Sequence, residues 1–302
     1  MCRDREYDVK RLRYYLEYAG LRFALFLLDR LSLSAANRLA CRIANLWYIC
    51  NISRRRIAVQ NILRSGIAKS HDEAAAVARA SFRHFAVLIV ESLRSDQVFN
   101  ENNWREKVEM DVSPAALKVL TEPGQGVILV SGHLGNWEVA AQLLSYLKPV
   151  VGITRDMNNP HADRVIQDRK PRNRFRLTPK HDAGAGRLLS VLKNGEILAL
   201  LIDQHARKRG SRIAFFGVPA STHTSPALRH LVTGAPLCFG YCLRKGPMSY
   251  TLRALDPIVY KPTGNREQDV RAILEKLTGL LEDAIRKAPD QYLWAHRRWR
   301  EA

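Results

Sequence analysis

The first third of the chain carries the spacing of amphipathic helices. From residue 7 to roughly residue 95, apolar side chains recur at intervals of three and four residues. The clearest helix follows Ser70, which can cap it, while Glu73 three residues later can complete a capping box. The pattern predicts a helical region over residues 1–95.

The pattern changes at Gly124. Short runs rich in apolar and β-branched residues follow: GVILV, PVVGIT, EILALLID, APLCFGYCLR and MSYTLRAL. Helical patterns such as WEVAAQLLSYL and AGRLLSVLKNG lie between several of them, and another spans Val270 to Ile285 before Pro289. This alternation predicts an α/β sheet covered by helices, within a core over residues 96–302.

Near the N-terminus, residues 14–33 are apolar but interrupted by charge. Glu17, Arg22, Asp29 and Arg30 break a stretch that a membrane-spanning helix would keep almost free of charges. We therefore expect a helix that lies in the membrane interface, flanked by basic residues. The alternative is an amphipathic helix packed on the protein's own core.

A formal net charge of +19 adds a constraint on partners. A charge this large favours a polyanion, such as a nucleic acid, an anionic membrane face, an acidic protein or a phosphorylated substrate. The sequence has no zinc finger, helix-turn-helix pattern or aromatic-basic RNA signature, so nucleic acid is the least favoured of these.

The stretch SGHLGNWEVA joins one of the predicted strands to a predicted helix. Gly132 ends the strand GVILV and Asn136 can cap the helix, which places His133 on a turn at the carboxyl edge of the sheet, where sites form in open α/β folds. Glu138 would lie in the first helical turn. Its carboxylate could accept a proton from one imidazole nitrogen and leave the other as a general base. The alternative is a loop histidine beside a solvated glutamate.

These residues also carry a resemblance. SGHLGNWE resembles the G-H-x-G-N-W-E block of the bacterial lipid A biosynthesis acyltransferases, the lauroyl and myristoyl group. It also has the H-x-x-x-x-D/E pattern of the wider lysophospholipid and glycerol-phosphate acyltransferase superfamily. Four more segments resemble family blocks in the same order: GITRDMNNP, LALLIDQHARKRG, IAFFGVPASTHTSPA and QYLWAHRRW. The five blocks are spread over about the last two thirds of the chain.

The resemblance implies a mixed sheet flanked by helices, as in glycerol-phosphate acyltransferases, and an O-acyltransferase activity. A fatty acyl group would move from a thioester of acyl carrier protein or coenzyme A to a hydroxyl of a lipid A precursor or related glycolipid, with no other cofactor. Another lysolipid or glycolipid acceptor remains open. A hydrolase is disfavoured because the chain has no G-x-S-x-G nucleophile elbow.

The same resemblance assigns the candidate site. The catalytic pair is His133 and Glu138, and the residues expected to bind substrate are Arg155, Asp203, Gln204 and Asn136. Arg155 would bind phosphate, with a surface salt bridge to Asp156 as the alternative. Asp203 could instead act structurally or hold a metal, but no cluster of partners supports a metal site.

The expected partners are all anionic: an acidic acyl carrier protein, a phospholipid membrane and a phosphorylated lipid acceptor. The expected location is the cytoplasmic face of the bacterial inner membrane. Two basic segments, residues 168–176 and 206–212, flank the candidate site and suit such partners. Ordinary solvated loops are the alternative for both.

Overall fold

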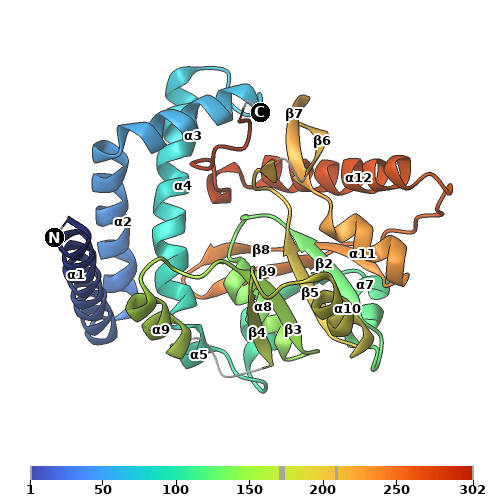
Figure 1. Cartoon of the computed structure of the whole chain (residues 1–302), viewed down its shortest axis with the longest axis horizontal. Coiled ribbons are helices and arrows are strands. Elements are labelled where there is room, and N and C mark those ends of the chain that lie inside the picture. Colours follow the sequence, from blue (N-terminus) through green and yellow to red (C-terminus); the bar gives the residue numbers. More distant parts are fainter. Residues whose placement is uncertain (1, 170–173, 208–209, 301–302) are drawn as a thin grey trace.

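The structure, a computed structural model, describes residues 2–169, 174–207 and 210–300, with side chains from residue 11 onward. Long N-terminal helices stand at one side of a sheet that further helices cover (Figure 1). These four are α1 (Cys2–Arg30), α2 (Leu33–Cys50), α3 (Ile52–Arg64) and α4 (His71–Ser92). The helices predicted for the first third of the chain are therefore confirmed.

Local capping explains where several of these helices begin. Ser32 caps α2 by accepting from the N–H of Ala35, and Asn51 caps α3 by accepting from Arg54. The predicted capping box of α4 is present, since Ser70 accepts from the N–H of Glu73 and the Glu73 carboxylate accepts in return from Ser70. Each cap satisfies a donor that the first helical turn cannot satisfy itself.

The central sheet is mixed, as expected. Its seven strands run in the order β1-β9-β8-β2-β5-β3-β4. The strands β8, β2, β5, β3 and β4 run parallel to one another, whereas β9 runs antiparallel to β8. Their bounds are β1 (Val108–Val112), β2 (Val127–Ser131), β3 (Val150–Thr154), β4 (Phe175–Pro179), β5 (Ile197–Leu201), β8 (Leu237–Gly246) and β9 (Ser249–Ala254).

The remaining elements cover the sheet or extend from it. They are α5 (Ser95–Val98), α6 (Trp104–Lys107), α7 (Pro114–Thr121), α8 (Trp137–Ser145), α9 (Pro160–Asp168), α10 (Ala185–Lys193), α11 (Ser225–Thr233), α12 (Arg266–Lys287), the 3₁₀ turn η2 (Pro289–Gln291), and a hairpin of β6 (Gly210–Phe215) with β7 (Val218–His223).

Alternation along β2 divides the core between the two faces of the sheet. Ile128 and Val130 join an apolar cluster with α10, α11 and α12, whereas Val127 and Leu129 join a second cluster with α7 and α8. The first cluster also contains residues of α3 and α4, so the N-terminal helices share a core with the sheet. The division at residue 95 into a separate region stays a prediction.

Helix α1 leaves much of its apolar surface exposed. Leu16 and Phe23 are 65% and 63% exposed, while Leu25 is buried. The helix is attached to α9, because Asn159 donates to the carbonyl of Tyr14 and Arg169 pairs with Asp29. Within the described part of the chain, no helix combines the length and the apolar character needed to cross a membrane.

Candidate active site

The site forms where β2 and β5 end side by side. Ser131 at the end of β2 is paired with Leu201 at the end of the parallel strand β5. His133 and Asp203 each follow two residues later, so the register brings their side chains to the same place at the carboxyl edge of the sheet. This adjacency joins residues 70 positions apart in the chain.

Asp203 holds His133 at two points. The Nδ1 atom of the ring lies 2.8 Å from Oδ1 of Asp203, and the backbone N–H of His133 donates to Oδ2 at 3.0 Å. Asp203 is only 3% exposed. Burial by itself would raise the pKa of this carboxyl, but the charge and the two hydrogen bonds of His133, together with the charge of Arg298, lower its pKa to about 2.

The ionised carboxylate of Asp203 fixes the tautomer of a neutral His133 ring. An ionised carboxylate can only accept hydrogen bonds, so Nδ1 of a neutral His133 ring carries the proton and Nε2 has a free lone pair. The side-chain amide nitrogen of Gln204 lies 3.3 Å from Nε2, and Trp137 packs edge-on against the ring at 4.9 Å. The His133 side chain is 17% exposed, so part of the ring lies at the surface.

The expected pairing of His133 with Glu138 needs a correction at Nδ1. Glu138 does lie in the first turn of α8, as predicted, but the carboxylate at Nδ1 belongs to Asp203. Sequence spacing favoured the nearby glutamate because it could not show that β2 and β5 are neighbours. The available signal was that an aspartate also follows a buried strand, at the end of EILALLI. A contribution of Glu138 to catalysis stays a prediction.

The backbone N–H groups of the turn are mostly committed to the protein. His133 donates to Asp203, and the next three residues donate to carbonyl groups of Gly132, Gln291 and Cys242 at 2.8–2.9 Å. The first turn of α8 is different, because N–H groups there have no acceptor within the helix. Asn136 accepts from the third of them, that of Val139, and the N–H group of Trp137 at the start of the helix is a possible donor to an anion.

A glycine is required at position 135. Its φ is +60°, and a Cβ there would lie 1.9 Å from the carbonyl oxygen of Cys242. Only glycine lets the turn pass this close to β8 in that conformation.

Asn136 does not fit the expected contact with substrate. It is fully buried, and its side-chain oxygen accepts from Val139 and from the hydroxyl of Ser92. Its amide nitrogen lies 3.4 Å from the hydroxyl of Tyr250. The cap predicted from the sequence is confirmed, and the residue positions the turn from inside the protein.

The C-terminal segment packs against the residues of the site. The backbone of Leu293 donates to the carbonyl of His133 at 3.1 Å, and the N–H of His205 donates to Nε2 of His296. Burial lowers the pKa of His296 to about 4, so the ring is neutral and can accept this bond at neutral pH. Arg298 is 3% exposed and donates to Thr222 at 2.6 Å. The QYLWAHRRW segment thus packs as part of the domain.

Arg155 lies farther from the histidine. It follows β3, which β5 separates from β2, and its side chain is exposed. The alternative surface pair with Asp156 is not what the structure shows, because Asp156 pairs with His181 at 3.3 Å. Of the predicted site residues, the structure brings together His133, Asp203 and Gln204, while Arg155 stays a predicted phosphate ligand at the same edge.

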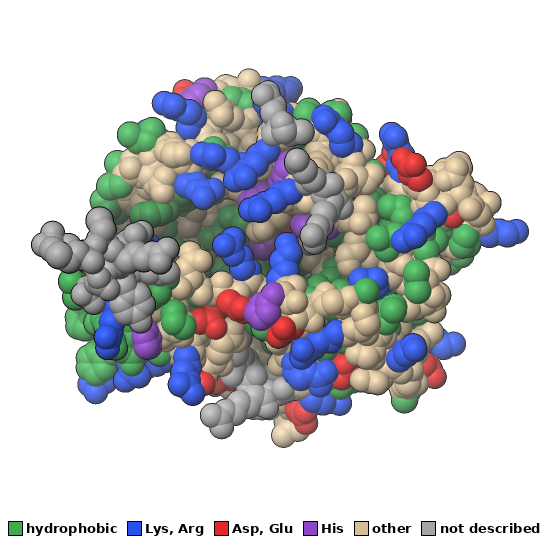
Figure 2. Space-filling view, in the orientation of Figure 1, with side chains coloured by type: hydrophobic (Ala, Val, Ile, Leu, Met, Phe, Trp, Pro, Cys, Tyr) green, Lys and Arg blue, Asp and Glu red, His purple; other side chains and the backbone are tan. Residues whose placement is uncertain are grey.

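Basic side chains surround this region of the surface. Figure 2 shows Lys and Arg gathered around a hollow between α4 and the sheet, with histidines inside it. Residues 170–173 and 208–209 of the two basic segments lie outside the described residues. Of the rest, Arg174 donates to the carbonyl of Tyr146, and Arg176 pairs with Glu196 at 2.8 Å. Among described residues, no group of three or more His, Cys, Asp or Glu side chains could hold a metal.

Comparisons with known proteins show the family of this chain. The sequence profile of the bacterial lipid A biosynthesis acyltransferases matches residues 3–301. The lipid A biosynthesis palmitoleoyltransferase of Escherichia coli K12 is 29% identical over 193 residues, which is 61% of this chain and 59% of the relative. The lauroyltransferase of the same organism is 25% identical over 201 residues, 65% of this chain and 62% of the relative.

Each match therefore spans about three fifths of the relative's length. Among solved structures, the 1-acyl-sn-glycerophosphate acyltransferase PlsC of Thermotoga maritima aligns with 82% of this chain and 96% of its own, at 14% identity and a TM-score of 0.35. The family match covers nearly the whole chain and includes every part of the site described above. This chain belongs to the bacterial lipid A biosynthesis acyltransferase family.

Proposed function

We propose that this protein transfers a fatty acyl chain from a thioester to a hydroxyl group of a lipid A precursor or related glycolipid. The observation that carries the proposal is the contact between Nδ1 of His133 and the buried carboxylate of Asp203, which leaves a free lone pair on Nε2 at the sheet edge. The relatives described above are a palmitoleoyltransferase and a lauroyltransferase of lipid A biosynthesis, so a lipid A precursor is the first acceptor to test.

The chemistry follows from this arrangement. Nε2 takes the proton of the acceptor hydroxyl as its oxygen attacks the carbonyl carbon of the thioester. Asp203 stabilises the imidazolium that forms. When the tetrahedral intermediate collapses, the carbon–sulfur bond breaks, the ester remains, and the imidazolium returns its proton to the thiolate. The direct transfer needs no acyl-enzyme, in keeping with a histidine as the central group.

The oxyanion of the intermediate needs donors that already point towards it. The N–H group of Trp137 begins α8 beside His133, where the helix dipole also favours a negative charge. The amide of Gln204, 3.3 Å from Nε2, is a second donor in reach of the reacting atoms. We assign the oxyanion to this side of the ring.

The net charge of the protein indicates its acyl donor, and its exposed apolar side chains indicate a membrane surface. An acidic acyl carrier protein suits a chain of net charge +19 with basic side chains around the site, and coenzyme A is the alternative carrier (Figure 2). Large apolar side chains are exposed on neighbouring N-terminal helices, including Leu16, Phe23, Ile43, Leu46 and Trp47. Such a surface supports attachment to the cytoplasmic face of the inner membrane, where the phosphorylated acceptor would be met.

Replacing His133 with alanine tests the proposal. Transfer of a labelled acyl group from acyl carrier protein to a lipid A precursor should fall by about 10²–10⁴-fold, since a positioned general base supplies that much. The melting temperature should stay near that of the wild type. His181→Ala, which removes an exposed histidine paired with Asp156, is the matched control and should keep its activity. A His133→Ala enzyme within a few-fold of wild type would overturn the mechanism.

A further inference from the structure

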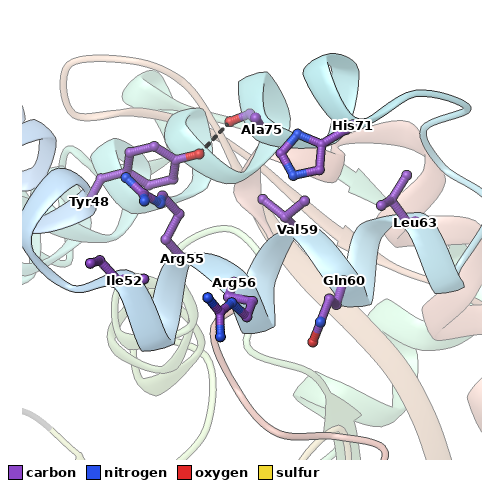
Figure 3. A pocket seen from close by; sticks show the side chains of 9 residues that line it. All are labelled: Tyr48, Ile52, Arg55, Arg56, Val59, Gln60, Leu63, His71 and Ala75. Carbon is purple, nitrogen blue, oxygen red and sulfur yellow. Dashed lines mark hydrogen bonds between the residues drawn. The ribbon is translucent and has the colours of Figure 1, made fainter.

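A second hollow lies away from the catalytic turn. The end of α2, one side of α3 and the start of α4 surround a groove of about 540 Å³ (Figure 3). Its surface is mostly apolar. Ile52, Val59 and Leu63 line it from α3, where spacings of four and seven residues place them on one side of the helix, and Ala75 lines it from α4.

Two guanidinium groups and an imidazole border this apolar surface. Arg55 and Arg56 come from α3, and His71 comes from the first turn of α4. The Arg55 guanidinium lies 5.7 Å from the centre of the Tyr48 ring, and the Tyr48 hydroxyl is held by the carbonyl of Ala75 (Figure 3). The described residues that line the groove include no carboxylate. An anionic group would therefore meet two guanidiniums without a competing acid.

The groove opens onto apolar surface. Ile52 lines the groove and is 55% exposed, and the end of α2, the helix that supplies Tyr48, exposes Leu46, Trp47 and Ile49 by 57–62%. The same part of the protein thus offers both the groove and exposed apolar side chains to a hydrocarbon chain. An occupant with both an anionic head and an apolar chain matches the groove and its surroundings together.

The opposite side of α3 belongs to different contacts. Asn61 donates to the carbonyls of Trp294 and His296, both at 2.8 Å, and Arg54 donates to the carbonyl of Ala295. The helix thus stands between the groove and the C-terminal segment beside His133. The groove is a separate site from the catalytic one.

We propose that this groove binds one anionic membrane phospholipid. Its phosphate is held by Arg55 beside Tyr48, Arg56 adds attraction from the next side of α3 (Figure 3), and one acyl chain lies along Ile52, Val59 and Leu63. The lipid is a bound companion and is not consumed, so the inference goes beyond acyl transfer and does not depend on it.

Binding of a monomeric short-chain lipid tests the head-group contact. Dihexanoyl phosphatidylglycerol, kept below its micelle concentration, would be titrated into the whole chain. Arg55→Ala/Arg56→Ala should weaken its binding by about tenfold or more, because charge-assisted hydrogen bonds are lost. Arg38→Ala/Arg42→Ala removes the same charge from exposed positions of α2 outside the groove and should change the dissociation constant less than about twofold. Equal losses in the two pairs would reduce the effect to general surface charge and overturn the proposal.

A filled groove tests the chain contact. Ala75→Met places a longer side chain in the groove and should weaken binding of the same lipid, whereas Ala76→Met, at the exposed neighbouring position, should not. Melting curves of both variants would show that each is folded. Failure of the wild type to bind the lipid, or binding of glycerol 3-phosphate as tightly as the lipid, would also overturn the proposal. These experiments measure lipid binding and not acyl transfer. Their outcome is therefore independent of the test of the proposed enzymatic function.

Discussion

The ring of His133 is oriented by a carboxylate that comes from another strand. Asp203 is buried, accepts from both the ring and the backbone of His133, and keeps its pKa at about 2. Such a carboxylate stays ionised through the neutral range and, in the proposed mechanism, stabilises the imidazolium in the transition state. Glu138, five residues from the histidine, begins the neighbouring helix and has a more open environment.

This difference predicts unequal effects of two matched substitutions. Asp203→Asn should lower kcat by about 10³-fold or more, because an amide donates to Nδ1 and moves the ring proton to Nε2. Glu138→Gln should lower kcat less than about tenfold, since the contact at Nδ1 of His133 is made by Asp203 and remains in this variant. Steady-state rates would be compared with those of Asp182→Asn, an exposed carboxylate beside His181. A larger loss in Glu138→Gln than in Asp203→Asn would return the orienting role to Glu138.

A cluster of buried polar contacts between elements is centred on Glu91 of α4. This carboxylate is fully buried and accepts from Arg244 of β8 at 3.0 Å, from Asn37 of α2 at 3.1 Å and from the hydroxyl of Tyr250 of β9. Burial and the negative charge of Glu91 raise the pKa of Tyr250, which therefore remains a donor. The same tyrosine contacts Asn136, so the cluster connects the N-terminal helices to the catalytic turn.

Breaking this cluster should cost much more than breaking a surface pair. Glu91→Gln leaves the buried side of Arg244 without its counter-charge and should lower the free energy of unfolding by about 3 kcal/mol. Glu109→Gln, which removes an exposed partner of Lys245, should cost less than about 1 kcal/mol. Urea unfolding of both variants measures the difference. Similar losses would mean that Glu91 acts only as a surface charge does.

At the scale of the whole molecule, the net charge of +19 attracts anionic partners over long distances. Some basic side chains are buried in contacts within the protein, as Lys148 is with the carbonyls of Val119 and Gln125 and Arg298 with Thr222. Others are exposed, including those around the hollow in Figure 2. Encounter with an acidic carrier should therefore depend on ionic strength.

We expect kcat/KM for acyl carrier protein to fall steeply as salt is raised, since charges are screened beyond about 8 Å at physiological ionic strength. The same acyl chain on N-acetylcysteamine, an uncharged thioester, serves as the control and should show a shallow dependence. Rates measured over a salt series for both donors provide the comparison. Parallel slopes would show that charge around the site does not recruit the donor.

The sequence alone determined the elements and the chemistry at their ends. Helical spacing and the Ser70 cap identified α4, and the run before Gly132 placed His133 between a strand and a helix. These features depend on side chains a few residues apart, so local periodicity and capping carry the information. The resemblance of five blocks then supplied the family without any knowledge of strand order.

Only the tertiary structure decided which carboxylate meets the histidine. The strand order places β5 beside β2, and the register then sets Asp203 against His133 across 70 residues of sequence. The tertiary structure also buries the side chain of Asn136 and places the C-terminal segment between α3 and the site. Strand order is selected by burial of both faces of the sheet against helices from distant parts of the chain. That selection is a property of the packed whole, and no local spacing records it.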